Sequence, residues 1–119
     1  MSELVPVFQA VARYFSVLGD PMRLHILYTL CSGELSVGEV VERTGGTQTN
    51  VSRHLKLMHE RGALARRKNG SLVYYSVADQ AMVEICRSVC QRVVGEIAST
   101  QNTQRGLQRN LRSAIEKFQ

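Results

Sequence analysis

Tryptophan is absent from this chain of 119 residues, and the aromatic residues together make up only 6% of it. A binding site built as a large cage of aromatic rings is therefore not expected. Long apolar runs are missing as well, because no stretch approaches the ~20 residues that a helix needs to cross a bilayer. The first ten residues contain Glu3 and Pro6 and lack the basic segment that opens a signal peptide. We therefore expect a cytoplasmic protein with no membrane partner.

The residue patterns of common enzyme sites are also missing. The chain has no glycine-rich loop to cradle phosphates, no histidine near a cysteine in sequence, and no close carboxylate pair for acid–base catalysis. An enzyme is therefore not expected. Cysteine is scarce, and its number, three, is odd. In a reducing compartment this favours free thiols, metal ligands or redox sensors over a framework of structural disulfides.

Positive charge is what the sequence has in excess. Lysine and arginine outnumber aspartate and glutamate by 15 to 10, which gives a net charge of +5. This balance permits binding to nucleic acid or to an acidic membrane and by itself shows neither. The basic residues concentrate in residues 53–68, a window that contains a single acidic residue, Glu60. The basic residues of this window are Arg53, Lys56, Arg61, Arg66, Arg67 and Lys68.

Apolar periodicity and capping residues predict a mainly α-helical protein with one small β-hairpin. We expect helices at 4–18, 21–31, 37–43, 48–60 and 79–98, and a last helix that carries Leu107, Leu111, Ala114, Ile115 and Phe118. Ser36 with Glu39 three residues later indicates a capping box. Thr47 is expected to cap the helix at 48–60 after the Gly45-Gly46 turn. The hairpin is predicted within 63–77, around Asn69-Gly70.

A short helix, a glycine turn and a second helix with small polar and basic residues at its start suit the major groove of DNA. Short side chains near a helix N-terminus reach base edges, where Gln and Asn pair with adenine and Arg with guanine. The candidate DNA-contacting residues of this helix are Gln48, Thr49, Asn50, Ser52, Arg53 and Lys56. In the hairpin, Arg66, Arg67 and Lys68 are expected to contact phosphates or the minor groove as a wing.

Four segments of the sequence resemble one family. They are LGDPMRLHIL (18–27), ELSVGEV (34–40), NVSRHLKL (50–57) and the stretch from Gly62 to Tyr74-Tyr75. Over roughly residues 8 to 94 the chain resembles the ArsR/SmtB family of winged-helix repressors. The resemblance implies a single winged helix-turn-helix domain over residues 1–119 whose terminal helices, in 1–18 and 79–119, pair two subunits.

The resemblance also implies a function. A homodimer would bind a palindromic operator in double-stranded DNA and leave it when an inducer is sensed. His54 falls in the family's Ser-x-His-Leu stretch, where a phosphate contact is expected. A packing or capping histidine is an equally good interpretation of His54.

The metal sites of this family do not match the sequence. One branch of the family binds soft metals through a Cys-x-Cys pair, and those positions here are Ser36 and Gly38. Another branch binds zinc through an Asp-x-His pair and a later His pair. Of those four ligands only the aspartate is present. The four positions are Asp79, Ala81, Arg92 and Gly95. The cysteines Cys31, Cys86 and Cys90 therefore remain as the candidate sensor.

Several interpretations of these thiols stay open. Cys86 and Cys90 lie one helical turn apart, where Cβ atoms are roughly 5–6 Å apart against the ~3.8 Å of a disulfide. In the family's thiol-sensing branch the two cysteines match Tyr28 and Val94 here, so Cys31 can meet Cys90 only if the two helices run antiparallel.

Three functions follow from these interpretations of the thiols. Cys31 could form a disulfide or polysulfide bridge with Cys90 or Cys86, which gives a repressor released by a thiol signal. All three thiolates could instead bind trivalent arsenic or another soft ion. If the cysteines are inert core residues, the chain is a DNA-binding protein without an inducer. The redox interpretation is slightly preferred, and no cofactor is certain.

Overall fold

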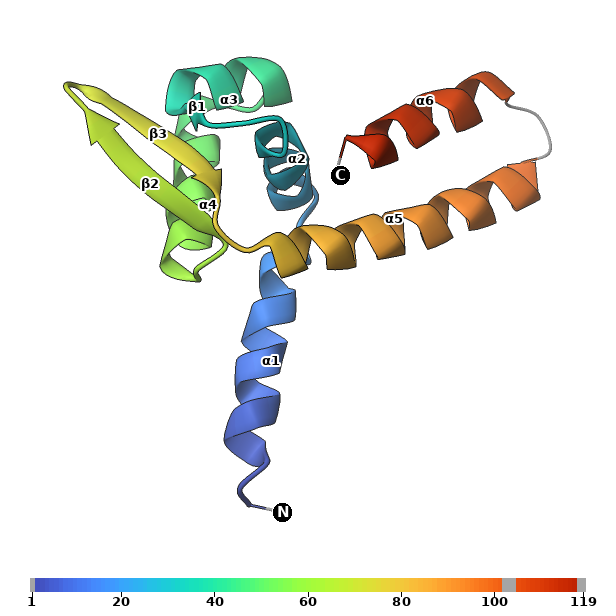
Figure 1. Ribbon diagram of the computed structural model, residues 1–119, viewed down its shortest axis with the longest axis horizontal. Coiled ribbons are helices and arrows are strands. Elements are labelled where there is room, and N and C mark those ends of the chain that lie inside the picture. The colour runs from blue at the N-terminus through green and yellow to red at the C-terminus, as the bar shows by residue number, and fades with distance from the viewer. Residues whose placement is uncertain (1, 102–104, 118–119) are drawn as a thin grey trace. The chain divides into compact units, whose positions relative to one another are not determined.

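The computed structural model describes residues 2–101 and 105–117 of the chain. It confirms the expected mainly helical architecture with a small antiparallel sheet. In chain order its elements are α1 (Val5–Val17), α2 (Pro21–Leu30), β1 (Leu35–Ser36), α3 (Val37–Thr44), α4 (Gln48–Glu60), β2 (Leu64–Asn69), β3 (Leu72–Val77), α5 (Gln80–Gln101) and α6 (Arg105–Glu116) (Figure 1). They form two compact units, Met1–Ala78 and Asp79–Gln119. The assignment of 1–119 to one domain with terminal dimerisation helices stays a prediction.

The core of the first unit lies among α2, α3 and α4, which pack on one another. Apolar side chains repeat every three or four residues along these helices, so each helix presents one face to the others. The fully or almost fully buried side chains of these helices are Ile26, Leu27, Leu30, Val40, Val51, Leu55 and Met58. Each such side chain contributes roughly 1.5–3 kcal/mol when it leaves water. This core fixes the helices that carry the candidate DNA-binding residues.

The predicted helix starts are confirmed at atomic detail. Asp20 caps α2 by accepting a hydrogen bond from the backbone N–H of Arg23 at 3.1 Å. Ser36 and Glu39 form the expected capping box of α3, in which each side chain accepts from the other residue's backbone N–H. These hydrogen bonds lower the pKa of Asp20 and of Glu39. Because every partner lies within three residues, these boundaries follow from local sequence.

The sheet has three antiparallel strands in the order β1-β3-β2. Pairing between β2 and β3 continues to Asn69 opposite Leu72, so the loop consists of Gly70 and Ser71. This loop is one residue later than the predicted Asn69-Gly70 turn, and Gly70 takes the positive φ of +63° that the tight turn requires. Strand β1 was not predicted, because a strand of two residues is too short to show the alternation of apolar and polar side chains that indicates a strand.

The second unit consists of α5 and α6, which contact each other. The first turns of α5 carry the buried residues Met82, Val83 and Cys86, whereas Val89, Val93 and Ile97 farther along are exposed. Ile115 of α6 is buried. Phe118, expected in the last helix, lies outside the described residues, as do the side chains of Leu107 and Leu111. Among the described residues, no helix is both long and apolar enough to cross a membrane.

Candidate nucleic-acid interface

The turn between α3 and α4 places the candidate recognition helix. Gly45 ends α3 with a φ of +75°, a left-handed conformation that residues with a Cβ rarely adopt. A Cβ on Gly46 would lie 2.8 Å from Cγ2 of Val51 and 3.0 Å from Cε of Met22. The second glycine is therefore required by close packing against α2 and α4. Thr47 then caps α4 by accepting from the backbone N–H of Asn50 at 3.2 Å.

Helix α4 has two chemically different faces. Val51, Leu55 and Met58 have no exposed surface and fix the helix to the core. The other face carries the polar residues that the sequence singled out. Of these, Gln48, Thr49, Arg53 and Lys56 are exposed, and Asn50 and Ser52 are half-buried. An Nη2 group of Arg53 donates to the side-chain oxygen of Asn50, which holds the arginine along the helix. The exposed face thus combines hydrogen-bonding groups and positive charge at the helix start, as major-groove recognition needs.

His54 lies inside the molecule and not on this exposed face. Only 9% of its surface is accessible. Its Nδ1 atom lies 3.3 Å from Nη1 of Arg23, and its Nε2 atom lies 3.8 Å from Oδ2 of Asp20. The phosphate contact expected for His54 stays a prediction, and this burial fits the alternative packing histidine better.

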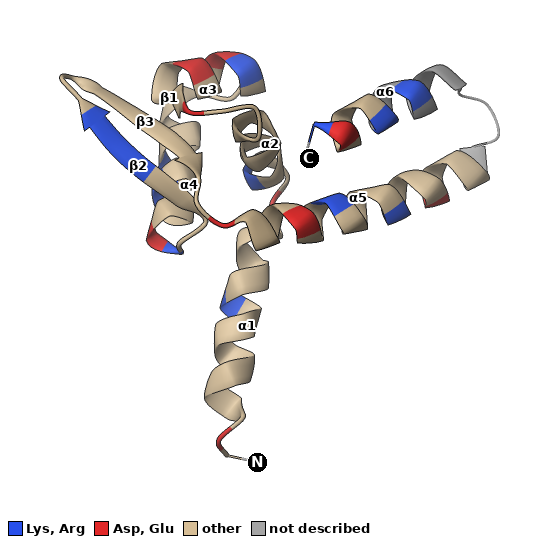
Figure 2. Cartoon of the chain, in the orientation of Figure 1, with Lys and Arg blue, Asp and Glu red and all other residues tan. Residues whose placement is uncertain are grey.

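The wing is the hairpin of β2 and β3, and its basic residues stand out in blue along β2 (Figure 2). Arg66, Arg67 and Lys68 are all exposed. Because side chains alternate along a strand, Arg66 and Lys68 lie on one face of the hairpin and Arg67 on the other. The structure therefore separates three residues that the sequence grouped together.

Arg67 is engaged within the protein. Its Nε and Nη2 atoms donate to the two carboxylate oxygens of Glu34 at 3.1 and 2.7 Å. The guanidinium also lies over the ring of Tyr74, 4.8 Å from the ring centre. The hydrogen bonds with Arg67 lower the pKa of Glu34, and the same pairing raises the pKa of Arg67. Arg67 thus joins the wing to the segment before β1, which makes it less available to DNA than Arg66 or Lys68.

A second set of contacts ties the wing to the end of α4. Strand β2 packs against α4. The Nδ1 group of His59 donates to the carbonyl oxygen of Leu64 at 3.1 Å, because a carbonyl can only accept. The ring of His59 also meets Tyr75 edge to face, with 6.4 Å between ring centres. The wing and the recognition helix are therefore held together as one surface.

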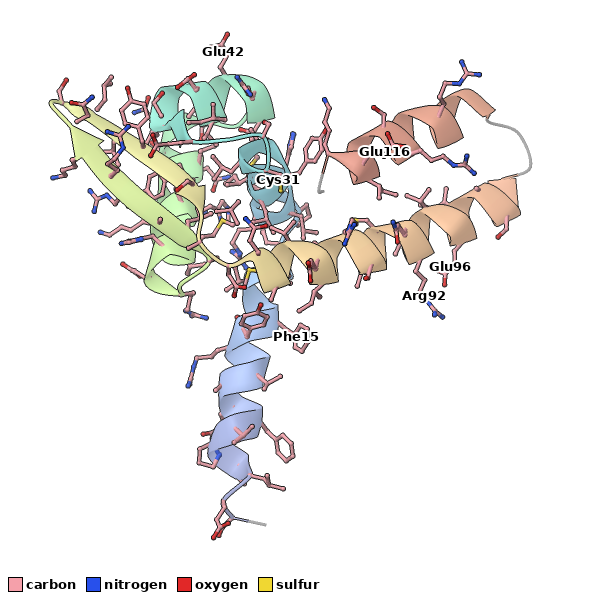
Figure 3. All side chains as sticks on the ribbon, in the orientation of Figure 1. Phe15, Cys31, Glu42, Arg92, Glu96 and Glu116 are labelled. Atoms are coloured by element: carbon pink, nitrogen blue, oxygen red, sulfur yellow. The ribbon has the colours of Figure 1, made fainter. Side chains whose placement is uncertain are left out.

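The three cysteines form no disulfide in the structure. Cys31 follows the last residue of α2 (Figure 3), is half-buried, and donates from Sγ to the carbonyl oxygen of Leu27 at 3.2 Å. Cys86 is buried and Cys90, one turn later on α5, is half-buried. Burial raises the pKa of the Cys31 and Cys90 thiols. Both thiols are therefore mainly protonated at neutral pH, which slows reactions that need a thiolate.

Two positions of the family's metal sites serve as helix caps in this chain. Ser36 caps α3, and Asp79 accepts from the backbone N–H of Met82 at 3.1 Å at the start of α5. In the part of the chain that the structure describes, no three His, Cys, Asp or Glu side chains come together as a group that could hold a metal ion.

Sequence reasoning missed the residues that hold the interface in place. Arg23 joins His54, Glu34 joins Arg67, and Tyr74 supports Arg67. Arg23 lies in the segment LGDPMRLHIL (18–27), but no nearby residue indicated that its partner would be His54. The alternation of side chains along β2 could have predicted part of this, since it places Arg67 on the opposite face of the hairpin from Arg66 and Lys68.

The fold and the exposed face of α4 define a winged helix-turn-helix DNA-binding protein. Residues 20–64 match the family described as bacterial regulatory protein, arsR family. A probable mercury resistance operon repressor of Streptomyces lividans is 36% identical over 74 residues, and the chain spans 59% of its length. An uncharacterised HTH-type transcriptional regulator of Mycobacterium tuberculosis is 30% identical over 98 residues, which are 82% of this chain and 85% of that protein. The chain belongs to the arsR family of DNA-binding transcriptional regulators.

Solved structures agree with this assignment. The homodimeric winged helix-turn-helix DNA-binding domain of a possible ArsR-family regulator from Mycobacterium bovis superposes with a TM-score of 0.69 at 27% identity, over 81% of this chain and 88% of that one. The transcriptional repressor BigR from Xylella fastidiosa gives a TM-score of 0.66 at 26% identity, over 76% and 92% of the two chains. These relatives are described as regulators of transcription.

Proposed function

We propose that this chain is a transcriptional repressor that binds a palindromic operator in the cytoplasm as a homodimer. Helix α4 enters the major groove, and the wing of β2 and β3 lies along the phosphate backbone. The observation that carries this proposal is the division of α4 into a fully buried apolar face and an exposed face with Gln48, Thr49, Arg53 and Lys56. A helix whose polar face is left exposed by its own fold is available to read base edges.

The exposed apolar surface of α1 supports the homodimer. Phe8 and Phe15 are 62% and 52% exposed, and Phe15 points away from the helix in Figure 3. The other exposed apolar residues of this region are Leu4, Val5, Val7 and Val11. A contiguous apolar surface of this kind marks a protein contact. A second copy is the favoured occupant because a similar fold, the Mycobacterium bovis domain, is homodimeric. Two-fold symmetry then places the two α4 helices about 34 Å apart, one turn of DNA.

The proposal is tested by fluorescence anisotropy with the purified full chain. Palindromic duplexes are selected from a random library, and the binding constant is measured over a range of salt concentrations with a scrambled duplex as the control. We expect tighter binding to the selected palindrome than to the scrambled DNA, with affinity falling as salt rises. Equal, salt-independent binding to both duplexes would contradict a repressor.

For the inducer, we propose that Cys31 and Cys90, or Cys86 in place of Cys90, form a disulfide or polysulfide bridge that lowers operator affinity. A peroxide would take two electrons and two protons from the thiols and be reduced to water, or a polysulfide would donate sulfane sulfur to the bridge and be reduced to sulfide. Support comes from three thiols outside any disulfide, in a protein in which the family's metal-site positions other than Asp79 carry different residues. A polysulfide bridge is longer than a disulfide and therefore joins thiols over a wider range of distances. A coupling of ~1–3 kcal/mol between the thiols and DNA would change operator affinity by about 5- to 150-fold.

A second candidate inducer is trivalent arsenic or another soft metal ion. The observation that favours it is the relatedness to a probable mercury resistance repressor and to a cadmium resistance regulatory protein homologue of Staphylococcus aureus, 37% identical over 76 residues. Thiolates are the ligands that such ions prefer, and binding would release their protons. A repressor without any inducer is the remaining alternative.

One titration separates these alternatives. Reduced protein on its operator is treated in turn with tetrasulfide, peroxide and arsenite, and the thiols are then identified by mass spectrometry. We expect tetrasulfide to release the DNA and to link Cys31 with Cys90 or Cys86. Release by arsenite alone would establish the metalloid alternative. Cys→Ser substitution at all three positions is the control, and unchanged regulation in that variant would contradict both sensing proposals.

A further inference from the structure

Arg23, at the start of α2, contacts two other helices at once. Its Nε group donates to the carbonyl oxygen of Val17 at 2.8 Å, and its Nη2 group donates to the carbonyl oxygen of Ser16 at 2.9 Å. Its Nη1 group lies 3.3 Å from Nδ1 of His54 in the middle of α4. Since a guanidinium only donates, Nδ1 of His54 is the acceptor in this contact. One side chain therefore joins the end of α1 to the recognition helix.

The state of His54 follows from this geometry. An accepting Nδ1 carries no proton, so in the neutral ring the proton sits on Nε2. That atom faces Oδ2 of Asp20 at 3.8 Å, and the same carboxylate oxygen accepts from the backbone N–H of Arg23. Asp20 and Arg23 thus hold the His54 ring from two sides. Because only 9% of the surface of His54 is accessible, these two partners and the surrounding packing fix the orientation of the ring.

The end of α1 is where this helix joins the rest of its unit. Val17 is the only buried residue of α1, whereas the side chains nearer the N-terminus are mostly exposed. Besides the Arg23 bonds, Nη1 of Arg61 donates to Oγ of Ser16 at 3.3 Å. Arg23 thus makes two hydrogen bonds to the end of α1, whereas Arg61 makes one.

We propose that Arg23 is a positioning residue for DNA recognition: through Val17, Ser16 and His54 it fixes the angle between α1 and α4. The inference rests on the proposed function, in which α1 pairs the subunits and α4 reads the groove. In such a dimer the angle between the two helices sets the spacing of the two recognition helices, and this spacing must match one turn of DNA. Arg23 itself touches no DNA.

The test compares Arg23→Gln with two controls in anisotropy titrations over a range of salt concentrations. We expect Arg23→Gln to weaken operator binding roughly tenfold or more with an unchanged salt slope, because a positioning residue neutralises no phosphate. Arg66→Gln, a wing variant, should reduce the slope by about one. Arg43→Gln removes the same charge at an exposed position of α3 and should weaken binding far less. Wild-type affinity in Arg23→Gln, or a lower salt slope, would overturn the proposal.

Variants at His54 separate positioning from general stability. Asn can present its side-chain oxygen near the place of Nδ1, so His54→Asn should keep most of the affinity, whereas His54→Leu should lose as much as Arg23→Gln. The double variant Arg23→Gln/His54→Leu should bind no worse than either single variant, since each substitution removes the same contact between Arg23 and His54. Additive losses would contradict a shared link. Thermal melts and sedimentation confirm that each compared variant is folded and dimeric.

A measurement on the unaltered protein keeps the proposal testable if the variants do not fold. Nitrogen-15 NMR distinguishes the protonated from the unprotonated ring nitrogen of each histidine. We expect His54 to be a single tautomer with its proton on Nε2 and an accepting Nδ1. A proton on Nδ1 would rule out the bond from Arg23 and overturn the inference. If wild-type protein fails to bind any palindrome, the proposed function fails instead, whatever the tautomer of His54.

Discussion

Helices α1 and α4 have the same length, 13 residues each, and both carry an apolar stripe, yet the protein uses them in opposite ways. In α4 the apolar residues Val51, Leu55 and Met58 are fully buried and the polar face is exposed. In α1 the apolar residues Phe8 and Phe15 are more than half exposed. An amphipathic pattern therefore indicates that a face will be covered, but not by what. For α4 the cover is its own domain, and for α1 we propose a second subunit.

The largest effect is expected from charging the exposed face of α1. The double substitution Phe8→Glu/Phe15→Glu should convert the dimer into monomer and lower operator affinity by about a thousandfold or more, since buried interface aromatics each contribute ~2 kcal/mol or more. Sedimentation velocity and anisotropy measure the two effects. Ala10→Glu, which adds one negative charge on another side of the helix, is the control. An unchanged dimer in the double variant would show that α1 does not join the subunits.

A smaller effect should follow from removing part of the buried face of α4. Leu55→Ala is expected to lower the free energy of unfolding by about 2–5 kcal/mol, because the lost contacts leave a cavity in a close-packed core. Lys56→Ala, the neighbouring position on the exposed face, should change stability by less than about 0.5 kcal/mol while weakening DNA binding. Urea unfolding at one protein concentration measures the stability of both variants. Equal stability of the two variants would contradict the division of α4 into two faces.

The same division between exposed and engaged residues extends to the wing. Arg66→Gln and Lys68→Gln should each weaken DNA binding several-fold and lower the salt slope by about 0.9, as expected for one phosphate contact. Arg67→Gln should change the slope less, because Glu34 already pairs with this guanidinium. Anisotropy over a range of salt concentrations measures the slopes. A slope change in Arg67→Gln as large as in Arg66→Gln would show that Arg67 leaves Glu34 for the DNA.

The smallest effect concerns two carboxylates, Glu34, which pairs with Arg67 of the wing, and Glu39, which takes part in the capping box of α3. Hydrogen bonds lower the pKa of Glu34 and of Glu39, so the unfolded chain binds more protons than the folded one in their titration range. Their stabilisation is present above the ordinary glutamate pKa of about 4.3 and is lost as pH falls through the lowered values. Glu34→Gln/Glu39→Gln should therefore flatten the fall in urea midpoint between pH 5 and 3. Parallel pH curves for the variant and wild-type would contradict this.

The sequence predicted the helix boundaries, the two-glycine turn, the hairpin and the polar face of α4, because each depends on residues close together in the chain. Ser36 and Glu39 illustrate this, since the whole capping box spans three residues. The hairpin loop was placed one residue too early, because composition does not fix strand register. The pairing of Arg67 with Glu34 was not predicted, since the two residues lie 33 positions apart. The burial of His54 against Arg23 was likewise not predictable from nearby residues, since the two lie 31 positions apart.

What the sequence determined by itself is the kind of protein: local capping, helical periodicity and basic side chains after a tight turn specify a winged helix-turn-helix. What the tertiary structure decided is which of these side chains are free to act. Arg66 and Lys68 stay exposed while Arg67 is paired, and His54 turns inward toward Arg23, 31 positions away. The physical reason is that caps and turns are satisfied within a few residues, whereas an ion pair or a buried ring depends on which distant segments packing brings together.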